Sequence, residues 1–507
     1  MDSNQEIQEQ RSFIHKLFST GLVVFSQVTQ IIVSIIRTKF TAILLGVTGV
    51  GLLGIYFSII ETVRTFTNFG INTSAVKFVS TSAIGGNEYS LPNAYRILFR
   101  WSLFSGILGC LVVFLFAHRL SIISFGNTDY FWGLIIASIS IIFLSIGQVF
   151  STFLQGIREI KKLVLGAICS SFISCILILL LYFFLRQSAI PISFIITGLS
   201  LCVVYFLLID KKYISHRDKI TFIKTVKPGL GMMKLGGFLV LNSLVALLSM
   251  YFIKIYINNN YGLENVGIYQ AVYAITNSYL GILLNAMLTE YYPHLCRVID
   301  EKKDLNKEIN QQAFITLNLG NTCVIILLIF SEFVLSILYS KEFIAGNDML
   351  MLYLVGASIN YIGWTLGVIF LATNDGLLTS ISTIIPNIFS FLFIIFLFPR
   401  LHLVSCGIAY IIQVITGTVF TVIILKKRFC FKFDKNNISI IIFYSSIIFL
   451  YLFLYFYLFK DSHKIIYFIL IKIALIAGTC LFCIFQMSKK VDIKYYLNKY
   501  FLAKENN

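Results

Sequence analysis

Charged residues are scarce in this chain of 507 residues: they make up 12% of it, whereas 58% of its residues are hydrophobic. A soluble globular protein carries about 25% charged residues. The apolar residues also form repeated runs of about 18 or more, a length that spans a bilayer as a helix. These absences predict an all-α integral membrane protein and exclude a soluble globular one.

The sequence lacks residues in the arrangement that metal sites, redox sites and signal peptides require. No His, Cys or carboxylate cluster has the spacing of metal ligands, and Cys480 and Cys483 form a CxxC inside the apolar run TCLFCIF, where small packing residues are expected. The N-terminus lacks the basic region of a signal peptide, so the first apolar run is expected to be retained. Even the longest connection, residues 210–231, is too short for a soluble catalytic domain, which favours a transporter without cofactors over an enzyme.

Apolar runs bounded by polar turns predict about fourteen transmembrane helices. The expected spans are 13–40, 48–80, 92–117, 130–155, 163–185, 190–209, 232–256, 264–290, 310–338, 348–372, 377–398, 402–425, 437–459 and 465–487. Lys and Arg gather at the termini and in every second loop, whereas the alternate loops hold only Arg119, Arg186, Lys341, Arg400, Lys460 and Lys464. The positive-inside rule therefore places both termini in the cytoplasm, and these loop cations explain the net charge of +17 without a nucleic-acid partner.

The two halves of the chain resemble each other. Gly46, Val50 and Gly51 match Gly262, Val266 and Gly267 at one constant spacing. Because the repeated unit has an even number of helices, the repeat is parallel, and transporter sites usually lie between such lobes. We expect an N-terminal six-helix lobe (1–209), a basic cytoplasmic linker (210–231), a C-terminal six-helix lobe (232–427) and a helical hairpin with a cytoplasmic tail (428–507).

Both lobes carry cations inside predicted spans, where a charge costs about 2.5–3.5 kcal/mol and normally faces a partner or a watery cavity. Lys254 precedes Gly267 by nearly the distance that separates Arg37 and Lys39 from Gly51. We expect a cationic cavity whose substrate-binding residues are Arg37, Lys39, Arg64 and Lys254. Polar residues on the same helices are expected to line or gate it, namely Gln27, Gln30, Glu61, Asn68, Gln270, Asn277 and Asn285.

Two alternatives remain open. Arg37 and Lys39 lie near a helix end, from which they could reach the outer interface, and Glu61 and Arg64 could form a structural pair that neutralises itself. Three further cations are expected to anchor the cytoplasmic interface: Lys77, Arg96 and Arg100. A cationic cavity with amide and phenol side chains suits a hydroxyl-rich solute that bears phosphate.

Five stretches together resemble the Wzx family of lipid-linked oligosaccharide flippases, of the O-antigen or enterobacterial-common-antigen type. They are ILLGVTGVGLLGIY from Ile43, NFGINTSAVKFVS from Asn68, FGNTDY from Phe125, NVGIYQAVYAITNSYLG from Asn265 and YYPHLCRVIDEKKDL from Tyr291. That family belongs to the multidrug/oligosaccharidyl-lipid/polysaccharide exporter superfamily and has basic residues matching Lys39, Lys77 and Lys254. The last two helices depart from its twelve-helix members.

The resemblance implies transport of an undecaprenyl-diphosphate-linked glycan from the cytoplasmic to the periplasmic leaflet of a bacterial inner membrane by alternating access. It also implies an ion gradient, of H⁺ or Na⁺, as the energy source, and the polysaccharide polymerase and chain-length machinery as partners. Two other classes compete. A multidrug exporter of the same superfamily would need an acidic or neutral cavity, and a glycan polymerase would need a long periplasmic loop.

Overall fold

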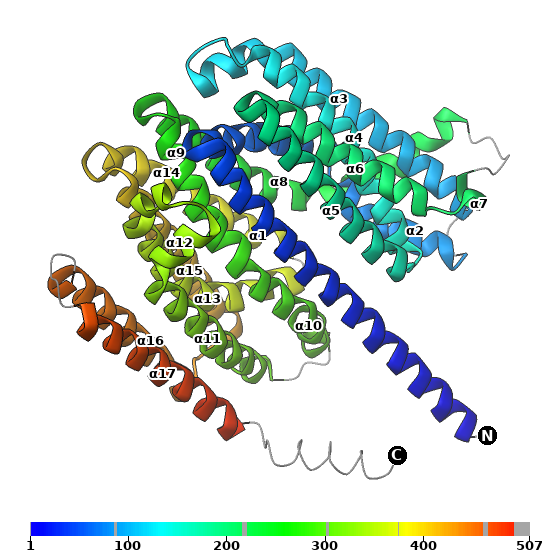
Figure 1. The fold of residues 1–507 in the computed structure, drawn as a ribbon. Coiled ribbons are helices and arrows are strands. Elements are labelled where there is room, and N and C mark those ends of the chain that lie inside the picture. Colours follow the sequence, from blue (N-terminus) through cyan, green and yellow to red (C-terminus); the bar gives the residue numbers. More distant parts are fainter. Residues whose placement is uncertain are drawn as a thin grey trace. The chain divides into compact units, whose positions relative to one another are not determined.

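The computed structural model describes residues 2–85, 89–214, 221–300, 304–373, 375–459 and 465–490 (Figure 1). This described part is helical and holds no strand. Residues 215–220 of the predicted basic linker and the predicted cytoplasmic tail at 491–507 lie outside it. The chain divides into two compact units, Met1–Gln270 with Ser336–Phe343, and Ala271–Leu335 with Ile344–Asn507.

Twelve helices of the described part are long and apolar enough to cross a membrane. Two of them, Phe25–Asn68 and Ile160–Leu208, each hold two predicted spans. The first turns at Gly46, whose φ of 69° is in the region that favours glycine, and the second turns at the 3₁₀ segment Arg186–Ala189. The prediction of an all-α membrane protein with about fourteen spans is therefore confirmed.

The first unit is built around α4, which packs against α3 and α6, while the long α1 packs against α3, α5 and α8. Its helices are α1 (Asp2–Asn68), α2 (Ile71–Ala83), α3 (Leu91–Phe125), α4 (Phe131–Gly156), α5 (Ile160–Leu185), α6 (Ile190–Leu208), α7 (Lys211–Ile214), α8 (Phe222–Tyr261) and most of α9 (Leu263–Tyr273). Stacked rings of Tyr95, Phe99 and Phe150 fill the space where α3 meets α4. This packing holds α1 and α8 in the positions that form the site described below.

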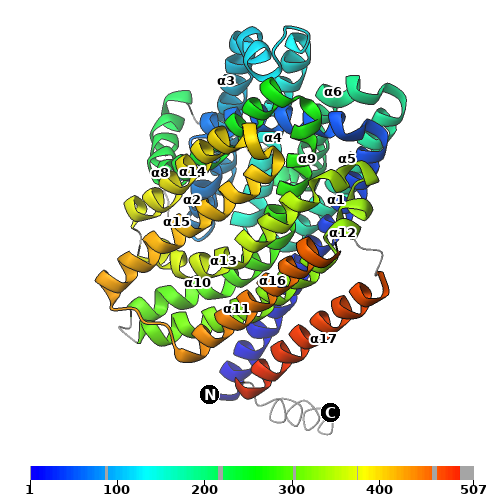
Figure 2. The same ribbon diagram turned by 90° about the vertical axis from the view of Figure 1, so that its left-hand side faces the viewer.

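In the second unit α13 packs against α11 and α15, and α14 against α15. Its helices are α10 (Leu280–Asp300), α11 (Leu305–Ile329), the start of α12 (Ser331–Leu338), α13 (Asn347–Ala372), α14 (Gly376–Leu401), α15 (Leu403–Phe429), α16 (Lys435–Leu454) and α17 (Ile465–Lys490). The last two helices form the predicted C-terminal hairpin (Figure 2). Each of them packs on α11.

Four predicted helices are interrupted or contain a π-helical stretch, among them 437–459, which ends in the π-helix η4 (Tyr455–Phe459). The predicted helix 48–80 breaks at Phe69 and Gly70, with φ of 50° and 74°, and the predicted helix 310–338 breaks at Phe330. The predicted helix 264–290 contains the π-helix η2 (Ala274–Tyr279), which joins α9 to α10. π-Helical turns are frequent at functional sites. The division into units falls just before this turn, at Gln270, and so differs from the lobe boundaries expected from the repeat.

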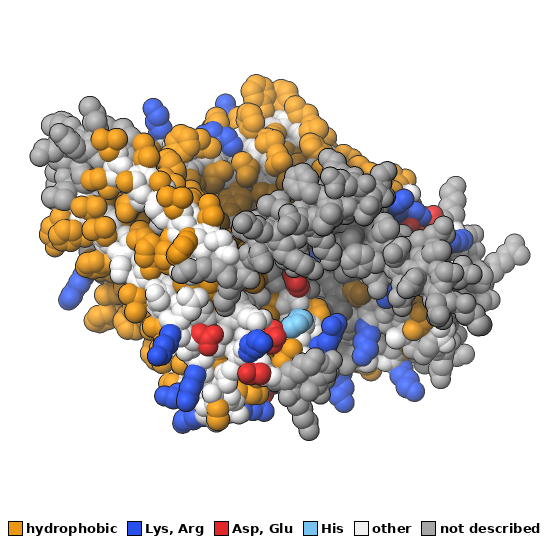
Figure 3. All heavy atoms as spheres, turned by 90° about the horizontal axis from the view of Figure 1, so that it is seen from below, with side chains coloured by type: hydrophobic (Ala, Val, Ile, Leu, Met, Phe, Trp, Pro, Cys, Tyr) orange, Lys and Arg blue, Asp and Glu red, His pale blue; other side chains and the backbone are white. Residues whose placement is uncertain are grey.

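Large hydrophobic side chains cover much of the surface, as expected of a protein solvated by lipid. Phe184, Phe396 and Phe449 are each more than 70% exposed. On the face shown in Figure 3, Lys and Arg side chains gather with Asp, Glu and His in the lower part of the view, and hydrophobic side chains cover broad areas of the rest that is coloured.

Candidate functional site

Lys254 is the fully buried cation of the described part, with 0% exposure on the membrane-spanning helix α8. Its Nζ donates to the Gly54 carbonyl oxygen at 2.9 Å and to the Ser58 hydroxyl at 2.8 Å, both on α1. The Ser58 hydroxyl in turn donates to the Gly54 carbonyl at 3.0 Å. An ammonium has three donors. Here two of them are used, and both acceptors are neutral.

A close crossing of α1 and α9 lies next to this lysine. A Cβ added at Gly51 would collide with the Leu263 carbonyl oxygen, and one added at Gly267 would collide with the Val47 carbonyl oxygen. Val47 and Leu263 each precede their glycine by one helical turn, so the two contacts are reciprocal. The matched glycines of the sequence repeat therefore meet in the structure, at a distance that only glycine allows.

Gln270 joins the same site from α9. Its side chain lies against Gly54, where an added Cβ would be 3.1 Å from the Gln270 Oε1 atom. That oxygen is buried and has no hydrogen-bond partner among the described residues. Lys254 and Gln270, both predicted as site residues, are thus brought together at Gly54. The Gln270 Oε1 atom there can still accept a hydrogen bond.

Arg37 and Lys39 face different neighbours, as expected for residues two apart on a helix. The Lys39 Nζ donates to the carbonyl oxygens of Ser336 and Tyr339, at 2.8 and 2.6 Å, and so caps the C-terminal end of α12. Arg37 is half-buried and lies near Cys175 and Tyr182 of α5, close enough to act on both electrostatically. The two predicted ligands therefore do not form one cluster in this conformation.

Arg64 forms a bidentate ion pair with Glu61 on α1. Its Nε lies 3.0 Å from Glu61 Oε2 and its Nη2 lies 2.6 Å from Glu61 Oε1. The side chains are 21% and 23% exposed. The carboxylate therefore balances the guanidinium charge, which is the self-neutralising arrangement left open by the sequence.

The remaining predicted residues are more exposed. Gln27 is exposed, Gln30 is half-buried and bonds to Ser26 at its own helix, and Asn68 is half-buried at the end of α1. Asn277, within the π-turn, and Asn285 belong to the second unit and are exposed. The predicted interface anchors follow the same trend: Lys77 is exposed, and Arg96 and Arg100 are half-buried on α3.

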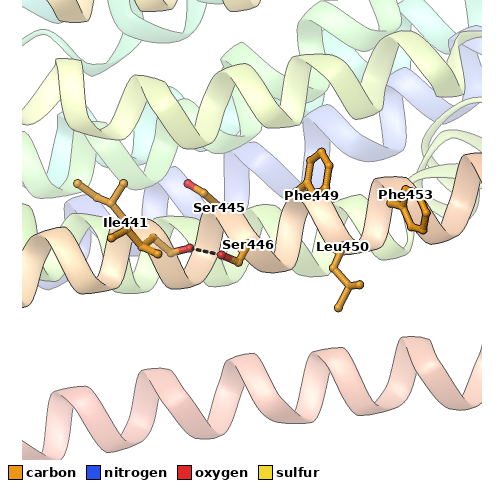
Figure 4. A pocket seen from close by; sticks show the side chains of 7 residues that line it. Ile441, Ser445, Ser446, Phe449, Leu450 and Phe453 are labelled. Atoms are coloured by element: carbon orange, nitrogen blue, oxygen red, sulfur yellow. Dashed lines mark hydrogen bonds between the residues drawn. The ribbon is translucent and has the colours of Figure 1, made fainter.

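The cavities on the described part include the following two. One, of about 670 Å³, runs along one face of α16 in the C-terminal hairpin and is lined by Ser445, Ser446 and five apolar side chains (Figure 4). The other, of about 180 Å³, is lined by Arg100, Trp101, Phe104, Thr225 and Val226, where α3 meets the start of α8. Arg100 is the predicted site residue that lines a cavity; Lys254 lines neither.

Sequence reasoning did not identify Ser58 or the Gly54 carbonyl as partners of Lys254. Ser58 stands in the apolar run YFSIIE and resembles any small residue of a packed helix. The repeat marked Gly51 and Gly267 as equivalent but gave no sign that they touch. Only the crossing of α1 with α8 and α9 brings these residues together.

Known proteins resemble this chain in sequence and in fold. The profile of the family described as "Polysaccharide biosynthesis protein" matches residues 17–299. The capsular polysaccharide biosynthesis protein CapF of Staphylococcus aureus is 25% identical over 297 residues, which are 58% of this chain and 72% of CapF.

The solved structures that share the fold include the following two. The lipid II flippase MurJ, in an inward closed conformation, matches this chain with a TM-score of 0.68 at 16% identity. The match covers 94% of this chain and 99% of the MurJ chain. An inward-facing multidrug resistance MATE family transporter of the MOP superfamily matches with a TM-score of 0.65 at 12% identity. This match covers 78% of this chain and 95% of the transporter chain. The family profile spans more than half of the chain and includes α1, α8 and α9, which build the Lys254 site. The chain therefore belongs to the polysaccharide biosynthesis protein family.

Proposed function

We propose that this protein is a flippase that moves undecaprenyl-diphosphate-linked oligosaccharides from the cytoplasmic to the periplasmic leaflet by alternating access. The observation that carries the proposal is Lys254, a membrane cation at 0% exposure whose partners are neutral oxygens. A charge in a membrane span is costly and is a functional-site hypothesis by default. An anionic headgroup met in another conformation explains why a lysine stands there, and the family supplies the class of solute, a polysaccharide precursor.

The diphosphate is the part of such a substrate that needs cations. Arg37, Lys39 and Lys254 have no carboxylate partner in the described part of the chain, whereas Arg64 is paired with Glu61. A lysine binds phosphate as a point charge and an arginine binds it bidentately. Arg37, Lys39 and Lys254 are therefore the proposed phosphate ligands, with the amides of the same helices available for sugar hydroxyls.

The setting of this transport belongs to the proposal too. The protein lies in the inner membrane of a bacterium with both termini in the cytoplasm, it needs no cofactor, and an H⁺ or Na⁺ gradient drives it. Its product is the substrate of a polysaccharide polymerase, for O-antigen or another surface polysaccharide.

A multidrug exporter is the second candidate, because MATE transporters share this fold. The charges argue against it. An exporter of cationic drugs is served by carboxylates in its cavity, whereas the fully buried charge among the described residues, Lys254, is positive.

The proposal is tested by complementation of a strain that lacks this gene. Lys254→Ala and Arg37→Ala are each expected to abolish surface glycan, because each removes a phosphate ligand, while immunoblots show that the variants still accumulate in the membrane. The matched control is Lys161→Ala, since Lys161 is an exposed lysine at the start of α5. Wild-type glycan levels in both site variants would rule out the assigned ligands.

A further inference from the structure

Lys254 cannot bind a substrate and keep its hydrogen bonds to α1 at the same time. Its ammonium cannot bind a substrate phosphate while it donates to the Gly54 carbonyl and the Ser58 hydroxyl at 0% exposure. We propose that these two oxygens are an internal binding site that withholds Lys254 from substrate for as long as α8 and α9 stay packed on α1. The inference rests on the proposed function, in which Lys254 is a substrate ligand, and it assigns Ser58 as a positioning residue.

The acceptors suit a temporary partner better than a permanent one. A carboxylate would hold the ammonium in a buried ion pair, and breaking such a pair costs far more than exchanging neutral hydrogen bonds. The carbonyl and the hydroxyl satisfy two donors without cancelling the charge. A diphosphate, which carries negative charge, then outcompetes them once the lysine can reach it.

The glycine crossing controls whether the lysine can leave. Gly51 and Gly267 let α1 approach α9 until each backbone touches the other, and Gly262, with φ of 86°, turns α8 into α9 directly before the contact. Because Lys254 lies near the end of α8, the same approach seats its ammonium on Gly54. Movement of the α8–α9 pair away from α1 opens the crossing and frees the lysine in one step.

Gln270 lies next to this internal site. Its buried Oε1 atom lies against Gly54 without a hydrogen-bond partner in the described part of the chain. The Gln270 amide therefore leaves unsatisfied hydrogen-bonding capacity beside the two oxygens that hold Lys254.

The chemical reactivity of Lys254 tests the inference without any transport assay. The full-length protein in lipid nanodiscs is treated with a small water-soluble acetylating reagent, and acetylation of Lys254 is quantified by mass spectrometry relative to the exposed Lys161. Wild-type Lys254 is expected to react far more slowly than Lys161. Gly267→Ala, which wedges the crossing apart, and Ser58→Ala, which removes one acceptor, are each expected to raise its reactivity several-fold.

Two controls separate this effect from general loosening. Gly237→Ala changes a glycine of the same α8 that has open space around it, and it is expected to leave Lys254 protected. Ser58→Thr keeps the hydroxyl and is expected to restore protection. If Gly267→Ala does not accumulate, the comparison of Ser58→Ala with Ser58→Thr decides the question.

Equal reactivity of Lys254 and Lys161 in the wild type would overturn the inference, as would full protection of Lys254 in both Gly267→Ala and Ser58→Ala. Transport itself is decided separately by complementation, because the footprint requires no substrate. Conversely, a normal footprint together with failed complementation by the wild-type gene would count against the flippase proposal alone.

Discussion

At the scale of single residues, three membrane cations of the first unit are satisfied in three different ways. Arg64 takes a carboxylate, Lys39 takes two carbonyl oxygens at the end of a helix, and Lys254 takes one carbonyl and one hydroxyl. The first arrangement cancels the charge and the second benefits from the negative end of the α12 dipole. The partners of Lys254 neither cancel its charge nor supply a helix dipole, so its charge is best explained by a functional role.

The Glu61–Arg64 pair makes a prediction at this scale. Arg64→Met leaves the partly buried Glu61 carboxylate without its partner, and Glu61→Gln does the same to Arg64, so each is expected to lower the free energy of unfolding by about 1–3 kcal/mol. The double variant removes both charges and is expected to lose less than the sum. A double-mutant cycle from denaturation of the purified protein measures this coupling, and strictly additive losses would show that the pair is not structural.

The residues also show the limits of inference from sequence. Lys254 stood out because a charge in an apolar run is visible in one dimension, and the Glu61–Arg64 pair because residues three apart share a helical face. The partners of Lys254 come from a helix about two hundred residues away in the chain, and no local spacing encodes them. Likewise, the divergence of Arg37 and Lys39 follows from helix geometry, but the neighbours that each one meets do not.

At the scale of elements, helix positions follow closely from the apolar runs, whereas interruptions within them do not. Gly46 and Gly262 mark real turns and stand at matched places in the repeat. The π-helix at Ala274–Tyr279 has the sequence AITNSY, which contains no proline or glycine from which an interruption of the helix could be predicted. It is stabilised by tertiary context, so the sequence of α9 and α10 alone predicts one continuous helix.

The contact of α16 with α11 makes a prediction at this scale. Asn310, at 2% exposure, donates to the Lys432 carbonyl at 2.9 Å and accepts from the Asp434 amide and from Asn437 Nδ2, at 2.9 and 3.0 Å. Asn310→Ala removes these three hydrogen bonds, while Asn437 Nδ2 keeps its bond to the backbone carbonyl of residue 310 at 2.9 Å. The substitution is expected to cost about 1–3 kcal/mol, because partly buried groups lose their partner.

Thermal denaturation and limited proteolysis of the connection from α15 to α16 measure this effect. The matched control is Asn436→Ala, an exposed asparagine on the first turn of α16, for which a change within about 0.5 kcal/mol is expected. Identical melting and cleavage for the two variants would mean that Asn310 does not hold the C-terminal hairpin.

At the scale of the whole molecule, composition was sufficient for the fold class. A chain that is 58% hydrophobic and 12% charged has no folded alternative to crossing the bilayer, and the number of crossings follows from the runs. Family membership and a fold shared with a lipid II flippase and with MATE transporters agree with that reading. The fold serves more than one kind of solute, so the solute has to be argued from the charges rather than from the architecture.

Transport by the purified protein tests the central claim most directly. The protein is reconstituted into liposomes that contain a fluorescent polyprenyl-diphosphate-linked oligosaccharide in one leaflet, and arrival of the glycan in the other leaflet is followed with an impermeant lectin or quencher under an imposed ion gradient. We expect translocation by the wild type and by Lys161→Ala, and none by Lys254→Ala. Export of a cationic dye by the wild type, without translocation of the glycolipid, would contradict the account.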